Sequence, residues 1–364
     1  MSGRRWLHAW TLVPLFAYGC SAPPTDAGDP VGRAASVPVS VSTPSPSPST
    51  TARGTEAAES PRLPFESGVR SILEDRRGDF WFGSHSEGAC RLHDGSFTCW
   101  DLSDPQVRNI YEDADGVIWF ERSEGLSRFD GETIVPYDAR EYGDADDWRA
   151  EPGDLWFKGD APMAIADREA DAGVFRWDGE RMQYLSFPPL RGVDRGANAY
   201  HASAGVARGA GGRLWFPMYG AVVGYHDGVF TVIDSVDLHV RAIHEDRRGV
   251  LWIGNNGVGV MRREGDQIVN FTDERGMGER LGAPSLDRVF SITEDANGHI
   301  WFGTVEHGAF RWDGESLAQF SEREGLASHH VFVLYVDRGG TLWAGGADPS
   351  GVARFDGAGF VPMY

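Results

Sequence analysis

Histidines, carboxylates and amides recur in short segments between apolar stretches of the sequence, and these side chains are the candidates for chemistry. Glu306 and His307 are adjacent, and a histidine beside a carboxylate can act as a general acid–base pair or bind a divalent metal. No H-E-x-x-H motif, nucleophile elbow or phosphate-binding loop accompanies them, so the pattern indicates binding without fixing a reaction. For each side chain, an exposed loop residue with no role is the alternative. The candidates are His85, Glu87, Arg122, Lys158, Asp160, His201, Tyr219, Asn255, Asn256, Glu306, His307 and His330.

Two sets of arginines recur at fixed positions. Arg70, Arg108 and Arg241 share one position of a predicted innermost strand. If these strands line a channel, the three guanidinium groups would attract an anionic ligand; structural ion pairs are the alternative. The other set precedes a hairpin, which predicts pairing with acidic residues of the neighbouring repeat. Its members are Arg91, Arg128, Arg176, Arg262, Arg311 and Arg354.

The elements that must position these side chains are copies of one repeat. Five copies begin with an apolar strand and run through a turn to a tryptophan, as in VRSILEDRRGDFWFG at 69–83. Two copies keep only the second half, GDLWF and GGRLWF, after polar or glycine-rich sequence. The E-D-x-x-G segment predicts a tight turn that the aspartate caps. The repeat tryptophans are Trp81, Trp119, Trp156, Trp215, Trp252, Trp301 and Trp343.

Each repeat contains a run that is apolar on both faces, such as Leu251, Trp252 and Ile253. A single sheet would leave one of those faces exposed, whereas a closed ring of seven lets each sheet cover the next. The sequence therefore predicts an all-β fold, a seven-bladed β-propeller of four-stranded blades over residues 62–364. Each repeat is expected to supply its own four strands, and residues 62–66 to add a fifth strand or a plug.

In such a ring the loops that carry the candidate residues share one face, where binding residues are commonly placed. The long insertions at 158–172, 185–200 and 272–286 fall on the same face. Trp148, Tyr200 and Tyr219 lie near these insertions in the sequence, and they could serve as aromatic platforms for a sugar.

The pattern V-x-x-I-x-E-D-x-x-G-x-x-W-x-G, followed by G-x-x-R-x-D-G, resembles the two-component regulator propeller family over residues 68–364. In that family the propeller is typically the periplasmic sensor part of a histidine kinase or hybrid regulator, often responding to glycans. The resemblance implies a stand-alone form here, because no kinase or transmembrane segment accompanies the repeats. The G-x-x-W-F element is also similar to streptogramin lyases, which leaves a metal-dependent lyase or hydrolase as an alternative.

The first sixty residues differ in composition from the repeats. Residues 1–20 resemble a bacterial lipoprotein signal peptide that ends at Cys20, with Arg4 and Arg5 before a short apolar run. Residues 21–61 are a Pro/Ser/Thr-rich linker that is expected to be disordered. These features predict a lipid-anchored protein of the cell envelope, on the outer membrane or the periplasmic face, with plain secretion as the alternative.

The two remaining cysteines, Cys90 and Cys99, flank Asp94 and Gly95 in the segment GACRLHDGSFTCW. A type I′ turn at Asp94-Gly95 would place the cysteines opposite each other in a non-hydrogen-bonded pair, where a disulfide fits. An oxidising compartment would preserve that bond, so a disulfide is predicted, with two buried thiols as the alternative.

Together these features predict an exported, monomeric ligand-binding propeller without a resident cofactor. Its net charge of −20 argues against a nucleic-acid partner. The expected ligand is a glycan or a small anion, and the expected partner is an envelope protein or a separate sensor kinase. Two alternatives stay open: an enzyme of the lyase kind, which would use a divalent metal, and a protein–protein interaction scaffold.

Overall fold

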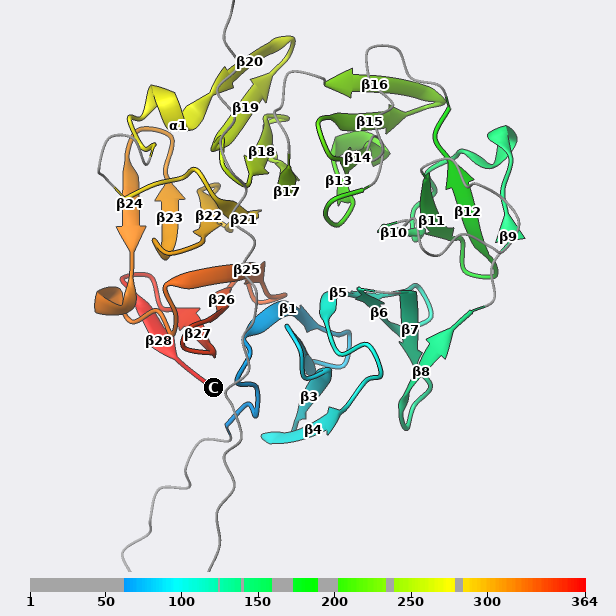
Figure 1. Cartoon of the computed structure of the whole chain (residues 1–364), viewed down its shortest axis with the longest axis horizontal. Coiled ribbons are helices and arrows are strands. Elements are labelled where there is room, and N and C mark those ends of the chain that lie inside the picture. The colour runs from blue at the N-terminus through cyan, green and yellow to red at the C-terminus, as the bar shows by residue number, and fades with distance from the viewer. Residues whose placement is uncertain are drawn as a thin grey trace, which may run out of the picture. The chain divides into compact units, whose positions relative to one another are not determined.

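The computed structural model describes residues 62–123, 125–138, 141–158, 173–188, 202–233, 239–278 and 284–364. The predicted signal peptide, Cys20 and the linker lie outside this part of the chain. Seven four-stranded sheets stand around a centre, which confirms the predicted seven-bladed β-propeller (Figure 1). The described residues contain one α-helix, α1 (Phe271–Glu274), and three 3-10 helices at Ala145–Asp147, Ala210–Gly212 and Glu322–Glu324. None of these helices is long and apolar enough to cross a membrane.

Five blades are antiparallel meanders whose strands follow the order of the sequence and have three residues or more each. Blade one contains β1 (Val69–Glu74), β2 (Phe80–Ser84), β3 (Ala89–His93) and β4 (Ser96–Trp100). Blade two contains β5 (Val107–Glu112), β6 (Ile118–Arg122), β7 (Gly125–Phe129) and β8 (Ile134–Tyr137). Blade five contains β17 (Val240–Glu245), β18 (Leu251–Asn255), β19 (Val260–Glu264) and β20 (Gln267–Asn270). Blade six contains β21 (Val289–Glu294), β22 (Ile300–Thr304), β23 (Ala309–Trp312) and β24 (Leu317–Phe320). Blade seven contains β25 (His330–Val336), β26 (Leu342–Ala347), β27 (Gly351–Phe355) and β28 (Phe360–Pro362).

Blades three and four depart from this plan. Blade three contains β10 (Leu155–Lys158), β11 (Gly173–Trp177) and β12 (Met182–Ser186), and its fourth strand is β9 (Glu141–Tyr142), which pairs in parallel with β12. No described residue pairs with the inner edge of β10. Each repeat thus supplies its own four strands, as predicted, although blade three arranges them in the order β10-β11-β12-β9. Blade four keeps all four, β13 (Ala207–Arg208), β14 (Leu214–Pro217), β15 (Val222–His226) and β16 (Val229–Ile233), but β13 has two residues.

The hydrophobic core consists of seven clusters, one between each pair of neighbouring blades. In the last cluster Trp343 of blade seven packs with Val69 and Phe82 of blade one, so the ring closes without an exchanged strand. Phe65 is buried in the same cluster. Residues 62–66 form no strand, so the predicted fifth strand is wrong, and the segment instead covers the seam between blades seven and one.

The E-D-x-x-G motif fixes each regular turn to its own tryptophan. Asp75 Oδ1 accepts hydrogen bonds from the backbone N–H groups of Arg77 and Asp79, while Oδ2 accepts one of 3.0 Å from Trp81 Nε1. The same aspartate–indole bond recurs in blades two, five, six and seven at 2.8–3.0 Å. The turn prediction is thus confirmed, and the aspartate also satisfies a buried indole donor, which would otherwise be costly.

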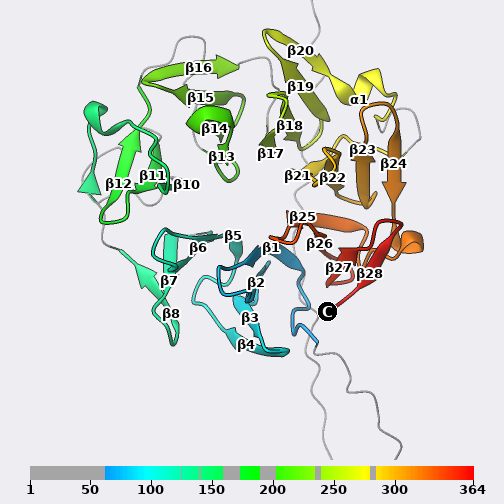
Figure 2. The same ribbon diagram turned by 180° about the vertical axis from the view of Figure 1, so that it is seen from behind.

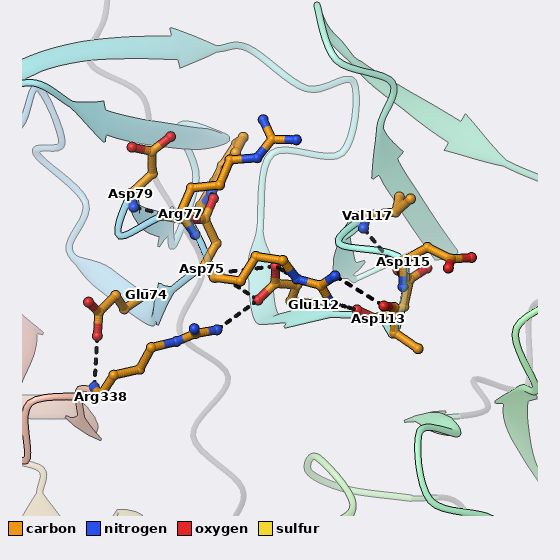
Figure 3. A network of polar contacts seen from close by, with 12 residues as sticks. Glu74, Asp75, Arg77, Asp79, Glu112, Asp113, Asp115, Val117 and Arg338 are labelled. Atoms are coloured by element: carbon orange, nitrogen blue, oxygen red, sulfur yellow. Dashed lines mark hydrogen bonds and ion pairs between the residues drawn. The ribbon is translucent and has the colours of Figure 1, made fainter.

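The glutamate of the same motif joins neighbouring blades (Figure 3). Glu112 of blade two lies 2.7 Å from Arg76 Nε of blade one, and Glu74 accepts a bond from the backbone N–H of Arg338 in blade seven. The predicted partners of these acids were the arginines before the hairpins, and that prediction is wrong. Four of those arginines lie over aromatic rings, as Arg91 does over Trp81 at 5.5 Å. Two form ion pairs within their own blade, Arg176 with Asp154 at 2.7 Å and Arg262 with Glu274 at 3.7 Å.

The hairpin of β3 and β4 has the predicted register. Asp94 and Gly95 both have positive φ values, 46° and 74°, as a type I′ turn requires. Cys90 therefore lies opposite Cys99, and the two form a disulfide, which confirms the predicted bond.

Candidate functional site

The centre of the ring contains a cavity of about 230 Å³ lined mainly by the innermost strands. β1, β5, β17, β21 and β25 lie around the centre of the ring (Figures 1 and 2), and each contributes residues to the lining of the cavity. Arg70, Arg108 and Arg241 project from β1, β5 and β17 at one repeat position, where the wall of the cavity has Phe290 and Phe332 in blades six and seven. The structure thus places the three predicted channel arginines in one cavity.

Aromatic rings orient two of these arginines. The guanidinium of Arg241 lies 5.1 Å from the ring centroid of Phe290, and that of Arg70 lies 4.8 Å from the centroid of Phe332. The two phenylalanine rings are themselves 5.7 Å apart, so an unbroken row of side chains crosses blades five, six, seven and one. Cation–π contacts of this kind hold a guanidinium in place without neutralising its charge.

No described carboxylate forms an ion pair with Arg70, Arg108 or Arg241, although the protein carries a net charge of −20. Arg108 donates a neutral bond of 2.9 Å to Gln106 Oε1. Burial and the charges of Arg108 and Arg241 lower the pKa of Arg70 from its usual value to about 10. The cavity is therefore a site of concentrated positive charge, and an anion would relieve the mutual repulsion of the guanidinium groups.

A polar wall continues the cavity toward blade three. Glu121 of β6 and Lys158 of β10 both line it. Glu121 is buried and accepts hydrogen bonds from Asn109 Nδ2 at 3.2 Å and Tyr111 Oη at 3.1 Å. Burial and the neighbouring Glu121 raise the pKa of Tyr111 well above its usual value. Glu121, Asn109 and the two phenylalanines were not predicted; for Glu121 the signal was present, because W-F-E replaces the usual W-F-G.

Two histidines lie close to the cavity. His85 Nδ1 is 3.1 Å from Gln106 Nε2, and Gln106 in turn accepts the bond from Arg108. Burial and the charges of Arg70 and Arg108 lower the pKa of His85. His239 packs against the ring of Tyr219 at 4.6 Å. Burial, Arg241 and Lys158 lower its pKa to about 4, so both imidazoles are neutral at pH 7.

Several other predicted residues have structural contacts away from the cavity. Glu87 binds the backbone N–H groups of Glu66 and Ser67, which fixes the segment before β1. Arg122 is buried 3.8 Å from Asp104, and the side-chain amide of Asn255 donates to the carbonyl of Gly259. Asn256 forms a β-bridge with Arg288.

The predicted acid–base candidates are spread over three blades, with His85 in blade one, Glu306 and His307 in blade six and His330 in blade seven, and none of them lines the central cavity. Glu306 lies 3.6 Å from Arg288, and His330 lies 4.0 Å from Asp348. The backbone carbonyl of His307 accepts a bond from Gln319. Within the described ranges no group of three or more His, Cys, Asp or Glu side chains is arranged to hold a metal ion. Asp160, His201 and Tyr200 lie outside those ranges.

The fold and the cavity define the class of this protein: a seven-bladed β-propeller with an arginine-rich centre. The family described as "Two component regulator propeller" matches residues 63–86, 235–257 and 284–306. The chain therefore carries repeats of the two-component regulator propeller family, as its sequence pattern predicted. No curated protein matches the sequence.

Solved structures share the fold. The extracellular domain of the putative hybrid two component system BT4673 from B. thetaiotaomicron has a TM-score of 0.56 at 18% identity, covering 79% of this chain and 38% of that one. The corresponding domain of BT3049 from the same organism has a TM-score of 0.57 at 14% identity, covering 85% and 49%. A streptogramin B lyase has a TM-score of 0.55 at 15% identity, covering 78% and 94%. This chain spans half or less of the two-component chains.

Proposed function

We propose that this protein is a ligand-binding propeller that takes a small anionic ligand in its central cavity. The observation that carries the proposal is the group of Arg70, Arg108 and Arg241, which share one cavity without a described carboxylate partner. Arginine side chains hold carboxylate and phosphate groups through charge-assisted hydrogen bonds. The likeness to extracellular domains of two-component systems supports a sensory role for such a site.

The finer proposal concerns where the protein acts and on what. We infer that it is exported, anchored by a lipid at Cys20, and that it reports its bound state to a separate envelope protein or sensor kinase. A glycan that carries acidic groups would satisfy both the cationic cavity and the family resemblance. The anchor and the partner each need their own experiment, such as metabolic labelling with a lipid and cross-linking in the cell envelope.

A binding experiment tests the cavity. Thermal shift and calorimetry would compare inorganic phosphate, citrate and a uronic-acid oligosaccharide on the wild type, on Arg108→Gln and on Arg77→Gln. Arg77 is an exposed arginine of the β1–β2 turn, so its variant matches the charge change outside the cavity. Loss of one charge-assisted contact should weaken binding by about tenfold or more in Arg108→Gln and leave Arg77→Gln unchanged. Equal losses in both variants, or no stabilisation by any anion, would contradict the proposal.

The lyase and scaffold alternatives remain predictions. The lyase likeness shows a shared fold at 15% identity, and the residues predicted for catalysis do not converge within the described part of the chain. A chelator distinguishes the first alternative, because ligand binding by arginines alone should not change when divalent metals are removed. A scaffold would instead copurify with a protein and ignore small anions.

A further inference from the structure

The contact between blades four and five differs from the other contacts in the ring. Six blades carry an arginine before the second hairpin, but blade four has Gly224 at that position. The glycine is packed closely against its own tryptophan: a Cβ at residue 224 would lie 2.6 Å from Cζ3 of Trp215. Blade four therefore lacks the guanidinium group that lies over the repeat tryptophan in blades one, three and six, as Arg311 does over Trp301 at 5.7 Å.

The neighbouring blade shows the complementary change. The next residue along the hairpin strand is aromatic in five blades, and in blade five it is Arg263. The aromatic residues are Phe129, Trp177, Tyr225, Trp312 and Phe355.

Three of these aromatic residues, Phe129, Trp177 and Phe355, pack on the tryptophan of the preceding blade. Trp81 contacts Phe129 at 5.0 Å and Trp301 contacts Phe355 at 4.9 Å, measured between ring centroids. Trp215 contacts no aromatic ring of any described residue. Arg213 and Arg263 lie over its ring instead, at 5.8 and 6.0 Å from the centroid. At Trp215 no aromatic side chain of a described residue occupies the position that Phe129, Trp177 and Phe355 occupy at other seams, and two arginines border that position.

A cavity of about 310 Å³ opens at this place, lined by Trp215, Tyr225, Leu251, Arg213 and Arg263. The corresponding cavity between blades five and six, where Arg262 and Trp312 are present, measures about 180 Å³. The larger cavity is thus associated with the changed residues.

The rim of the larger cavity carries two arginines and one carboxylate, Arg213, Arg263 and Asp266. Arg213 is bound to Glu245 at 3.2 Å, whereas the one ion pair of Arg263 with a described residue is to the fully exposed Asp266, at 3.7 Å. An aromatic floor with an incompletely paired guanidinium at its edge suits a flat ligand that carries one negative charge.

We propose that the cavity between blades four and five is a second binding site, which takes an aromatic carboxylate. The ring of the ligand lies against Trp215, where other blades place an aromatic side chain, and the carboxylate binds Arg263. This site involves none of the residues of the central cavity, so it does not depend on the function proposed above.

Benzoate is the probe that tests this site, with acetate to measure the contribution of the ring. Calorimetry and ligand-observed NMR on the full chain should show that benzoate binds about tenfold or more tightly than acetate. Arg263→Phe, which restores the aromatic residue of the other blades, should weaken benzoate binding by at least about tenfold and keep the fold. Arg263→Gln serves the same purpose if the phenylalanine variant does not fold, and Arg77→Gln is the charge-matched control.

Three results would overturn the proposal. Equal affinities for benzoate and acetate would remove the role of the ring. Unchanged benzoate binding in both Arg263 variants would remove the role of the guanidinium. Loss of benzoate binding in Arg108→Gln but not in the Arg263 variants would move the ligand to the central cavity, and it would leave the function proposed for that cavity intact.

Discussion

Replacing Arg70 by methionine should make the protein more stable in the absence of ligand and less able to bind an anion. In the folded protein, burial and the charges of Arg108 and Arg241 lower the pKa of Arg70 from its usual value to about 10. A difference of that size corresponds to about 3 kcal/mol of unfavourable free energy for the charged form. Methionine keeps an unbranched side chain against Phe332 but gives up the cation–π contact, which costs about 1 kcal/mol. The net expected gain is about 2 kcal/mol.

The gain can be measured by urea or thermal unfolding in a buffer of a weakly binding anion. For a domain of this size, about 2 kcal/mol raises the melting temperature by about 4 °C. The folded protein holds the Arg70 proton less tightly than the unfolded chain does. Its unfavourable contribution is therefore complete below pH 10 and fades as the pH rises above 10, so the difference between variant and wild type should be the same at pH 7 and pH 9.

The anion response of the same variant gives the second half of the prediction. Phosphate or citrate should stabilise Arg70→Met by less than it stabilises the wild type, because one of three guanidinium groups is gone. The exposed Arg77→Met is the control and should change neither property. A variant that is less stable than the wild type without ligand would refute the reasoning, since it would mean that Arg70 is held by a favourable interaction rather than by its packing alone.

Three further predictions concern stability. Asp113→Ala should lower the free energy of unfolding by about 3 kcal/mol, measured by urea denaturation, because buried donors that include Trp119 Nε1 lose their acceptor. The folded pKa of His239, about 4, lies below that of the unfolded chain, so the wild type should lose stability as the pH falls from 6.5 toward 4, and the melting temperature of His239→Phe should fall less over that window. Reducing the bond between Cys90 and Cys99, which are 9 positions apart, should cost about 2–3 kcal/mol, and a Cys90→Ala, Cys99→Ala protein should no longer respond to reductant.

The fold could be predicted from the sequence because the contacts that define each regular repeat join residues that are close together in the sequence. The aspartate of the turn and the indole that it binds are six positions apart, as Asp75 and Trp81 are, so both partners of the contact lie in one short segment. The disulfide was predictable for the same reason, since the turn at Asp94 and Gly95 alone sets the register of Cys90 and Cys99. Interactions within one hairpin can be predicted without information about the neighbouring blade.

The errors concern contacts between blades. The hairpin arginines were expected to pair with acids, but the acid Glu112 is bound by Arg76, which the turn of the preceding blade presents at 2.7 Å. The hairpin arginine of that blade, Arg91, then remains over Trp81. Likewise, the repeat position identified the three channel arginines, but the absence of a described carboxylate partner depends on which side chains the other blades direct into the centre. The spacing of residues in the sequence does not show which side chains of different blades lie together at the centre of the ring.

The polar part of the central cavity lies where no described strand covers the inner edge of β10 in blade three. In regular blades the second residue after the tryptophan is glycine, because the innermost strand of the next blade lies on it: a Cβ on Gly83 would lie 2.6 Å from Val107 Cγ1, and one on Gly254 would lie 2.9 Å from Val289 Cγ1. Blade two faces blade three, where no described strand covers the inner edge of β10, and there the same position is Glu121.

Blade three in turn faces the two-residue β13, and its residue at that position is Lys158. Charged side chains thus stand at two positions where a complete neighbouring strand would demand glycine, and both line the cavity. The irregular strands of blades three and four are therefore connected with the candidate site. Where neighbouring blades pack less closely, the centre of the ring has room for side chains that can contact a ligand. In this protein a charged residue at a position that is glycine in the regular blades identifies residues that line the cavity, as Glu121 and Lys158 do. The described histidines of the loops, which the sequence also suggested, do not line it.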